Sequence, residues 1–258
     1  STMSFFSSKL AALKTAATAL ATPSGFSSMS AASADGAIVA SVTGAAASAS
    51  YDVTVTQLAQ VQKTRSNAQA SASTALNESG PLTIKVGSGA EVNVSIAATD
   101  TLADIATKIN QSGARVSASI IDAGGSYRLS VQGLDTGTAN AVTFTEGGTV
   151  SLGLSSGANT YEAAQDAKVT IDGLVITRPT NSVSDAIQGV TLALKKTTTA
   201  PAKVDVAPDS AALKAKLNAF VSAYNDVVKT GQTIAGYGTT KAQNSVLAAD
   251  RGIRRSLD

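Results

Sequence analysis

Residues 210–228 read SAALKAKLNAFVSAYNDVV, with apolar residues spaced alternately four and three positions apart. These residues are Leu213, Leu217, Phe220, Tyr224 and Val227. Such spacing is typical of the packing face of an α-helix. Near the other end of the chain, the same spacing joins Phe6, Leu10, Leu13, Ala17 and Leu20. Two such faces at opposite ends can pair only if the chain between them is an insertion. The sequence therefore predicts one helical unit built from both chain ends.

Proline and N-capping residues set the expected limits of these helices. We expect the first helix to end before Pro23, because proline cannot continue a helix. Asp209 or Ser210 is a suitable N-cap for the second helix, which we expect to run toward Ile234. A third, short helix is expected over residues 250–257.

The middle of the chain has the alternating pattern of half-buried strands. Val53 and Val55 alternate with polar residues, and similar alternation recurs through the insertion. The expected strands are 51–55, 82–86, 92–96, 116–120, 127–131, 141–145, 169–171, 175–178, 192–194 and 204–206. One short helix interrupts them at 102–109, with Asp100 or Thr101 as its N-cap. Residues 147–159 are rich in Gly and Ser and predict a loop. The predicted fold class is α+β and multidomain, with β-rich heads beyond a helical leg.

Composition excludes several kinds of chemistry. The 258 residues contain no Cys, His or Trp, whereas Ala, Ser and Thr together number 110. A Ser-His-Asp triad, a thiol nucleophile and a zinc finger are therefore impossible. Net charge is only +2, and charged residues make up 15%, so nucleic acid is an unexpected partner. No run of about 18 apolar residues is present, so we expect no membrane-spanning helix. We predict no catalytic, cofactor-binding or metal site.

Three local patterns have a chemical and a structural interpretation. Asp100 and Asp104 could act as an acid/base pair, but beside a helix start an N-cap is the favoured interpretation. The Asp172-Gly173 pair resembles part of a calcium loop, yet the other ligands are missing and a turn is favoured. The basic cluster Arg251, Arg254 and Arg255, beside Lys241, predicts a solvated helix face or an interface.

Several stretches resemble the flagellar filament-capping family, also called hook-associated protein 2 or FliD. TQLAQ at residues 56–60 is similar to a family signature that follows a strand. TLADIATKIN at 101–110 resembles the short helix shared by flagellar axial proteins, and the later Tyr127-Arg128-Leu129 strand also matches. The stretches AQDA at 164–167, NSVSDAIQGVTL at 181–192 and FVSAYN at 220–225 complete the resemblance in family order. The matches extend roughly from Leu10 to Leu257. The family's flexible N-terminal segment and long C-terminal helix are not matched, so we expect a middle fragment.

The resemblance implies a nested domain order. The helical leg would comprise residues 1–30 and 207–258. An inner β-rich head would comprise 36–66 and 164–206, and an outer β-rich head, with the short helix, would comprise 67–163 inserted into it. The candidate assembly residues are those of the two helix faces: Phe6, Leu10, Leu13, Leu20, Leu213, Leu217, Phe220 and Tyr224. Their structural interpretation is an ordinary helix-packing core.

The resemblance also implies a function without bond chemistry. The full-length protein would form an annular homo-oligomer of about five subunits at the tip of a growing bacterial flagellum. It would be exported by the flagellar secretion apparatus without a cleaved signal peptide. Its expected partners are flagellin and the hook–filament junction proteins, with no membrane and no nucleic acid. The alternatives are another flagellar axial or junction protein, or a surface adhesin module.

Overall fold

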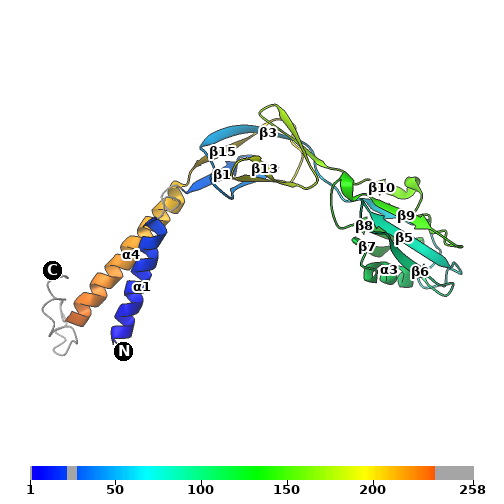
Figure 1. Cartoon of the computed structure of the whole chain (residues 1–258), viewed down its shortest axis with the longest axis horizontal. Coiled ribbons are helices and arrows are strands. Elements are labelled where there is room, and N and C mark those ends of the chain that lie inside the picture. The colour runs from blue at the N-terminus through cyan, green and yellow to red at the C-terminus, as the bar shows by residue number, and fades with distance from the viewer. Residues whose placement is uncertain (1, 22–27, 236–258) are drawn as a thin grey trace. The chain divides into compact units, whose positions relative to one another are not determined.

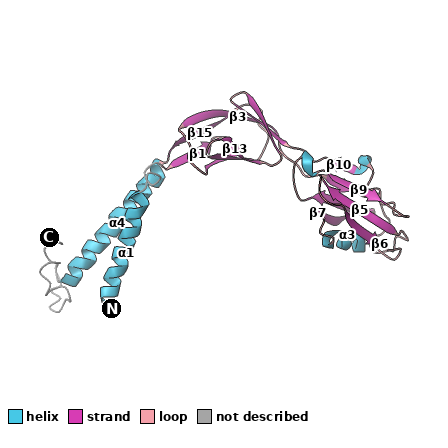
Figure 2. Cartoon of the chain, in the orientation of Figure 1, coloured by secondary structure: helices cyan, strands magenta, loops and turns pink. Residues whose placement is uncertain are grey.

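The computed structural model describes residues 2–21 and 28–235, and the chain divides into two compact units. One unit contains residues 1–30 and 206–258, and the other contains residues 31–205. Figure 2 shows that helices make up the first unit and that strands dominate the second. The predicted fold class, α+β with a helical leg built from both chain ends and β-rich heads, is confirmed.

The leg is a pair of helices from opposite ends of the sequence. Helices α1 (Thr2–Ala21) and α4 (Ser210–Ala235) lie side by side (Figure 1). Of the two expected caps, Asp209 is the one that acts: its Oδ1 accepts a hydrogen bond from the backbone N–H of Ala212 at 2.8 Å. The expected stop of α4 at residues 236–238 and the third helix at 250–257 lie outside the described residues.

Two sheets are built from residues 29–57 and 167–208. Five strands form the first sheet in the order β1 (Met29–Ser33), β15 (Ala202–Pro208), β3 (Ala49–Gln57), β11 (Ala167–Ile171) and β12 (Leu174–Arg178). Three antiparallel strands form the second, in the order β13 (Ser182–Ile187), β14 (Val190–Leu194) and β2 (Ile38–Val42). Alternating residues such as Val53, Val55 and Val169 are almost fully buried, as their period of two predicts. The alternation in the sequence did not predict β1, β2 or β13, nor two short strands outside these sheets, at residues 63–65 and 160–162.

Two further sheets and one helix are built from residues 63–162. The four-stranded sheet has the order β10 (Thr160–Glu162), β4 (Lys63–Arg65), β8 (Tyr127–Gly133) and β7 (Val116–Asp122). The three-stranded sheet has the order β6 (Val92–Ile96), β5 (Gly80–Val86) and β9 (Val142–Glu146). Helix α3 (Leu102–Gln111) contacts β7, β6 and β8 (Figure 1). Single 3-10 turns occur at Thr138–Asn140 and Gly157–Asn159.

The core of this second group is continuous and apolar. Leu82, Ile84, Leu102, Ile105 and Leu129 are each 0% exposed, and burial of such a side chain contributes about 1.5–3 kcal/mol. Residues 147–159 form the expected loop with one 3-10 turn, but the loop also closes the core. Its three alternating apolar residues, Val150, Leu152 and Leu154, are buried in the same cluster.

The pairing of β4 bears on where one head would end and the next begin. The expected inner head includes residues up to 66, yet β4 pairs with β8 and β10, whose residues belong to the expected outer head. The outer core cluster contains residues from 76 to 154 only. We therefore propose that the inner and outer heads meet near Gln62 on the outgoing chain.

Candidate assembly site

The inner face of the leg follows a heptad-like spacing. On α4 the half-buried residues include Leu213, Phe220 and Val227, with Lys216 and Ala223 between them. On α1 the half-buried residues include Phe6, Lys9, Leu13, Ala16, Ala17 and Leu20. Small side chains at three of these positions let the two helices approach closely. Of the eight candidate residues, this seam therefore contains Phe6, Leu13, Leu20, Leu213 and Phe220.

The other three candidate residues lie more exposed. Leu10 is 44% exposed, Leu217 is 41% exposed and Tyr224 is 53% exposed. Two apolar residues of the same helices that were not predicted are also exposed, Phe5 at 55% and Val221 at 52%. Leu217, Val221 and Tyr224 are spaced four and three residues apart, so they form a second stripe on α4. We call these three residues the leg stripe.

An ion pair joins α1 to α4. Lys9 Nζ lies 2.7 Å from Asp226 Oδ2, and the same ammonium lies 5.5 Å from the centre of the Phe5 ring. The hydrogen bond from Lys9, followed by its charge, lowers the pKa of the Asp226 carboxyl. Both side chains are partly exposed, so this pair contributes little to stability, about 0–1 kcal/mol.

A second exposed apolar feature lies at the turn between β11 and β12. Asp172 has φ of 47° and Gly173 has φ of 84°, the left-handed conformations of a two-residue hairpin turn. Directly after it, Leu174 is 71% exposed and Val175 is 72% exposed. Beside them is a groove of about 250 Å³ that Ile171, Leu174 and Ile187 help to line. We call Leu174 and Val175 the hairpin tip.

The Asp172-Gly173 pair predicts this hairpin turn but not the exposure of its tip. A signal was present, because Leu174, Val175 and Ile176 are three consecutive apolar residues. Successive side chains of a strand point to opposite faces, so one buried face cannot cover all three. Only Ile176 of the three is partly buried.

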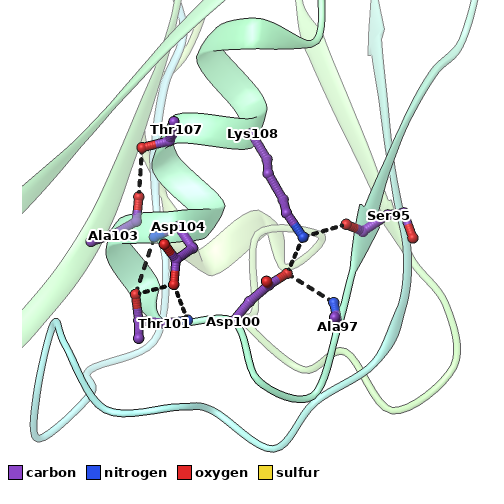
Figure 3. A network of polar contacts seen from close by, with 8 residues as sticks. All are labelled: Ser95, Ala97, Asp100, Thr101, Ala103, Asp104, Thr107 and Lys108. Atoms are coloured by element: carbon purple, nitrogen blue, oxygen red, sulfur yellow. Dashed lines mark hydrogen bonds and ion pairs between the residues drawn. The ribbon is translucent and has the colours of Figure 1, made fainter.

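The paired carboxylates before α3 have structural roles. Thr101 is the N-cap: its Oγ1 accepts from the backbone N–H of Asp104, and Asp104 Oδ2 accepts from the N–H of Thr101 at 3.0 Å (Figure 3). This reciprocal arrangement is a capping box. Asp100 instead accepts from Lys108 Nζ and from the backbone N–H of Ala97. Of the two expected N-caps, Thr101 is the correct one. Asp100 precedes the helix and accepts a hydrogen bond from Lys108 of α3.

Hydrogen bonding also explains the charge state of these groups. The backbone and side-chain hydrogen bonds from Thr101 lower the pKa of Asp104. The hydrogen bond from Lys108, followed by that from Ala97, lowers the pKa of Asp100 against the opposing effect of burial. A general acid needs a raised pKa, so neither carboxyl suits acid/base work near neutral pH.

The remaining candidate patterns are turns or lie beyond the described residues. Asp122 Oδ1 accepts from the N–H of Gly125 within its own turn. Asp172 Oδ1 accepts from the N–H of Asp52, so this carboxylate joins the hairpin turn to β3. Among the described residues, no three Asp or Glu side chains gather as a metal site would require. None of the helices within residues 2–21 and 28–235 has the length and apolarity to span a membrane. The basic cluster Lys241, Arg251, Arg254 and Arg255 lies outside the described residues.

Three family models match successive parts of the chain. The model described as flagellar hook-associated protein 2 N-terminus matches residues 1–62, and the C-terminus of the same family matches residues 164–257. Between them, residues 81–135 match the flagellin hook IN motif.

Curated relatives extend the similarity along the chain. Flagellar hook-associated protein 2 of Escherichia coli K12 is 32% identical over 96% of this chain and 57% of the relative. The B-type flagellar hook-associated protein 2 of Pseudomonas aeruginosa is 33% identical over 87% of this chain and 52% of the relative. The chain thus spans little more than half the length of these relatives.

Solved structures agree with the sequence relatives. The D1-D2-D3 domains of the flagellar cap protein FliD from E. coli are 31% identical, with a TM-score of 0.81, over 99% of this chain and 74% of that chain. The D2-D3 domains from E. coli are 31% identical, with a TM-score of 0.65, over 70% of this chain and 100% of that chain. The chain belongs to the flagellar hook-associated protein 2 family, the FliD cap proteins.

Proposed function

We propose that the protein containing this chain caps the tip of the growing bacterial flagellar filament and holds exported flagellin while it folds and inserts. One observation carries the proposal: both terminal models of hook-associated protein 2 match this chain, on either side of the IN motif and in family order. Similarity to the solved cap domains over 99% of the chain supports it.

The work of such a cap would be mechanical and would require no enzymatic step. Its free energy would come from exchanging one set of subunit contacts for another. Exposed apolar side chains suit such exchange, because the burial lost when one neighbour leaves can be replaced by burial against the next. The leg stripe and the hairpin tip are exposed apolar surfaces of this kind.

We assign the candidate residues two roles within this function. Phe6, Leu13, Leu20, Leu213 and Phe220 would hold the leg together, because they are half-buried between α1 and α4. Leu10, Leu217 and Tyr224 would contact other subunits, because 41–53% of each side chain is exposed. The partners would be further copies of the protein in an annular homo-oligomer of about five subunits, with flagellin and the junction proteins as neighbours.

The protein would act outside the cell, at the distal end of the filament, after export by the flagellar secretion apparatus. Another flagellar axial or junction protein is the second candidate, because the IN motif at residues 81–135 is not itself a model of the cap family. The flanking N-terminal and C-terminal matches favour the cap.

Genetic complementation tests the proposal. The full-length protein is expressed in a cap-deficient strain of the source bacterium, and filament length is measured by electron microscopy. We expect the wild-type protein to restore long filaments. Short or absent filaments, at normal levels of exported protein, would contradict the proposed function.

A matched pair of variants tests the leg stripe in the same strain. Leu217→Glu places a charge in the stripe, whereas Asn218→Glu places the same charge at the adjacent exposed position of α4. We expect Leu217→Glu to shorten the filaments and Asn218→Glu to leave their length unchanged. Equal effects of the two variants would contradict a role for the leg stripe in contacts between subunits, without contradicting the cap function.

A further inference from the structure

Two chain segments link the proposed outer head to the proposed inner head. The outgoing segment includes Gln60 and the returning segment includes Gln165, and the two form one antiparallel bridge. The N–H of Gln60 donates to the carbonyl of Gln165 at 2.9 Å, and the reverse bond is 3.2 Å. One side-chain bond, from Gln165 Nε2 to the carbonyl of Leu58 at 2.9 Å, adds to this bridge. So few bonds leave a linker able to bend and twist, and motion between domains is the default for such a connection.

A third segment, the loop between β8 and β9, adds contacts to residues of the inner head. Its first anchor is Asp166. The backbone N–H of Thr138 donates to Asp166 Oδ1 at 2.8 Å, and Thr138 Oγ1 donates to Oδ2 at 2.9 Å. Both carboxylate oxygens are therefore engaged by one loop residue. The backbone carbonyl of Asp166 accepts from Gln57 Nε2 at 2.7 Å, which ties this anchor to β3.

The second anchor of the same loop is Pro179, which follows β12. Thr136 Oγ1 donates to the carbonyl of Pro179 at 2.6 Å. Gly137 has φ of 99°, and a Cβ there would lie 2.7 Å from Pro179 Cβ and 2.9 Å from Pro179 Cα. Only glycine permits both this backbone conformation and this approach. The N–H of Gly137 also donates to the carbonyl of Gln60 at 3.2 Å.

The loop is rigid on its own side as well. Asn140 Nδ2 donates to the carbonyl of Thr136 at 2.8 Å, and a 3-10 turn covers Thr138–Asn140. The chain then enters β9, where Val142 is buried in the outer core. The loop is therefore joined to the outer core through Val142, and a displacement of Asp166 or Pro179 would displace the outer core as well.

We propose that Thr136, Gly137 and Thr138, with Asp166 and Pro179, form a clasp that holds the outer head in one orientation on the inner head. One anchor, Asp166, directly follows Gln165 on the returning segment, and the other, Pro179, lies beyond β12. Together they would remove the bending and twisting that the linker alone would allow. The two heads then move as one stiff body. This inference concerns the chain itself and does not depend on the cap function, so either can fail without the other.

Distance measurement between paired spin labels tests the clasp. The chain contains no native cysteine, so Ser119→Cys in β7 and Thr177→Cys in β12 give two unique exposed labelling sites. Double electron–electron resonance on the 258-residue chain then reports the distribution of distances between the heads. With the clasp intact we expect one narrow distribution.

Asp166→Ala removes both bonds to Thr138 and leaves only the anchor at Pro179, and we expect it to make the distribution about twofold wider or more. Glu78→Ala is the matched control. Glu78 accepts from the N–H of Ser151 at 3.0 Å and from its hydroxyl at 2.8 Å, the same pair of bonds, but Ser151 belongs to the same head. We expect Glu78→Ala to leave the width unchanged.

Thr138→Val is a second variant, which removes only the hydroxyl bond to Asp166 and keeps the backbone bond and the side-chain shape. We expect it to widen the distribution by less than Asp166→Ala does. Circular dichroism confirms that each variant is folded before it is measured. Equal widths for Asp166→Ala, Glu78→Ala and the parent would overturn the proposal, as would a parent distribution that is already broad.

Discussion

Replacement of Asp100 by Asn tests the physical account of the helix that closes the outer core. Asp100 is 8% exposed, and its carboxylate accepts from Lys108 Nζ and from the N–H of Ala97 at 2.8 Å (Figure 3). Lys108 Nζ also donates to the carbonyl of Ser95 at 3.1 Å. The carboxylate thus joins the second turn of α3 to the end of β6. Asparagine keeps the size and one acceptor but removes the charge.

The size of the effect follows from these contacts. A hydrogen bond to a charged group contributes about 1.5–3 kcal/mol to stability. The Lys108 side chain is 38% exposed, and solvent screening reduces the expected loss to about 1–2 kcal/mol. Such a loss corresponds to a factor of about 5–30 in the equilibrium between closed and open forms. We expect amide hydrogen exchange in α3 and β6 to accelerate by that factor at pH 7.

We expect the difference in exchange rate between wild type and Asp100→Asn to disappear in acid. The hydrogen bond from Lys108, and next that from Ala97, lowers the pKa of Asp100 in the folded protein. A lowered pKa stabilises the fold fully above the ordinary value of about 3.9, and the contribution disappears as pH falls through the lower folded value. The gap between wild type and Asp100→Asn should therefore be full at pH 7 and should shrink progressively below about pH 4.

Hydrogen exchange followed by mass spectrometry measures both effects, with rates corrected for the intrinsic pH dependence of exchange. Asp122→Asn is the control, because Asp122 accepts one hydrogen bond from the nearby Gly125 in an exposed turn. The reasoning is refuted if Asp100→Asn and Asp122→Asn exchange alike at pH 7. It is also refuted if the gap between wild type and Asp100→Asn persists unchanged in acid.

Three further predictions concern the outer head and the leg. Ile105→Ala should destabilise the outer core by about 2–5 kcal/mol, because the residue is 0% exposed and leaves a cavity; denaturant unfolding followed by hydrogen exchange measures the loss. Gly80→Ala should lower the unfolding midpoint, because its Cβ would lie 2.2 Å from the carbonyl oxygen of Gly147, whereas Gly157→Ala, with open space around its Cβ, should not. Phe220→Ala should lower the helical signal of the leg on heating in circular dichroism, because Phe220 is half-buried; an unchanged melting curve would contradict its place in the seam.

The sequence predicted elements well where large apolar residues alternate clearly. Val53 and Val55 in β3, and Leu82 and Ile84 in β5, identified their strands because each places two bulky side chains on one face. Strands β1 and β2 were missed because residues 29–42 are mostly Ala, Ser and Gly, and only Ile38 of β2 is buried. Small residues leave the period of two almost without a hydrophobic signal.

The surfaces were harder to predict than the elements. The two helix faces were identified from spacing, but spacing alone did not separate the seam, with Phe220, from the leg stripe, with Leu217 and Tyr224. On a helix, both sets lie within one broad apolar sector, and the rotation of each helix against its partner decides which set is covered. The clasp lay beyond sequence reasoning, because Asp166 and Thr138 meet only after both heads have folded.

The position of the protein on the flagellum tests the proposed function most directly. An epitope tag is inserted in the exposed turn at residues 123–125 of the full-length protein, and gold-labelled antibody is located on growing filaments by electron microscopy. The account predicts gold at the distal tip of each filament, at a position that moves outward as the filament lengthens. Gold at the junction between hook and filament, or spread along the filament, would contradict the cap assignment.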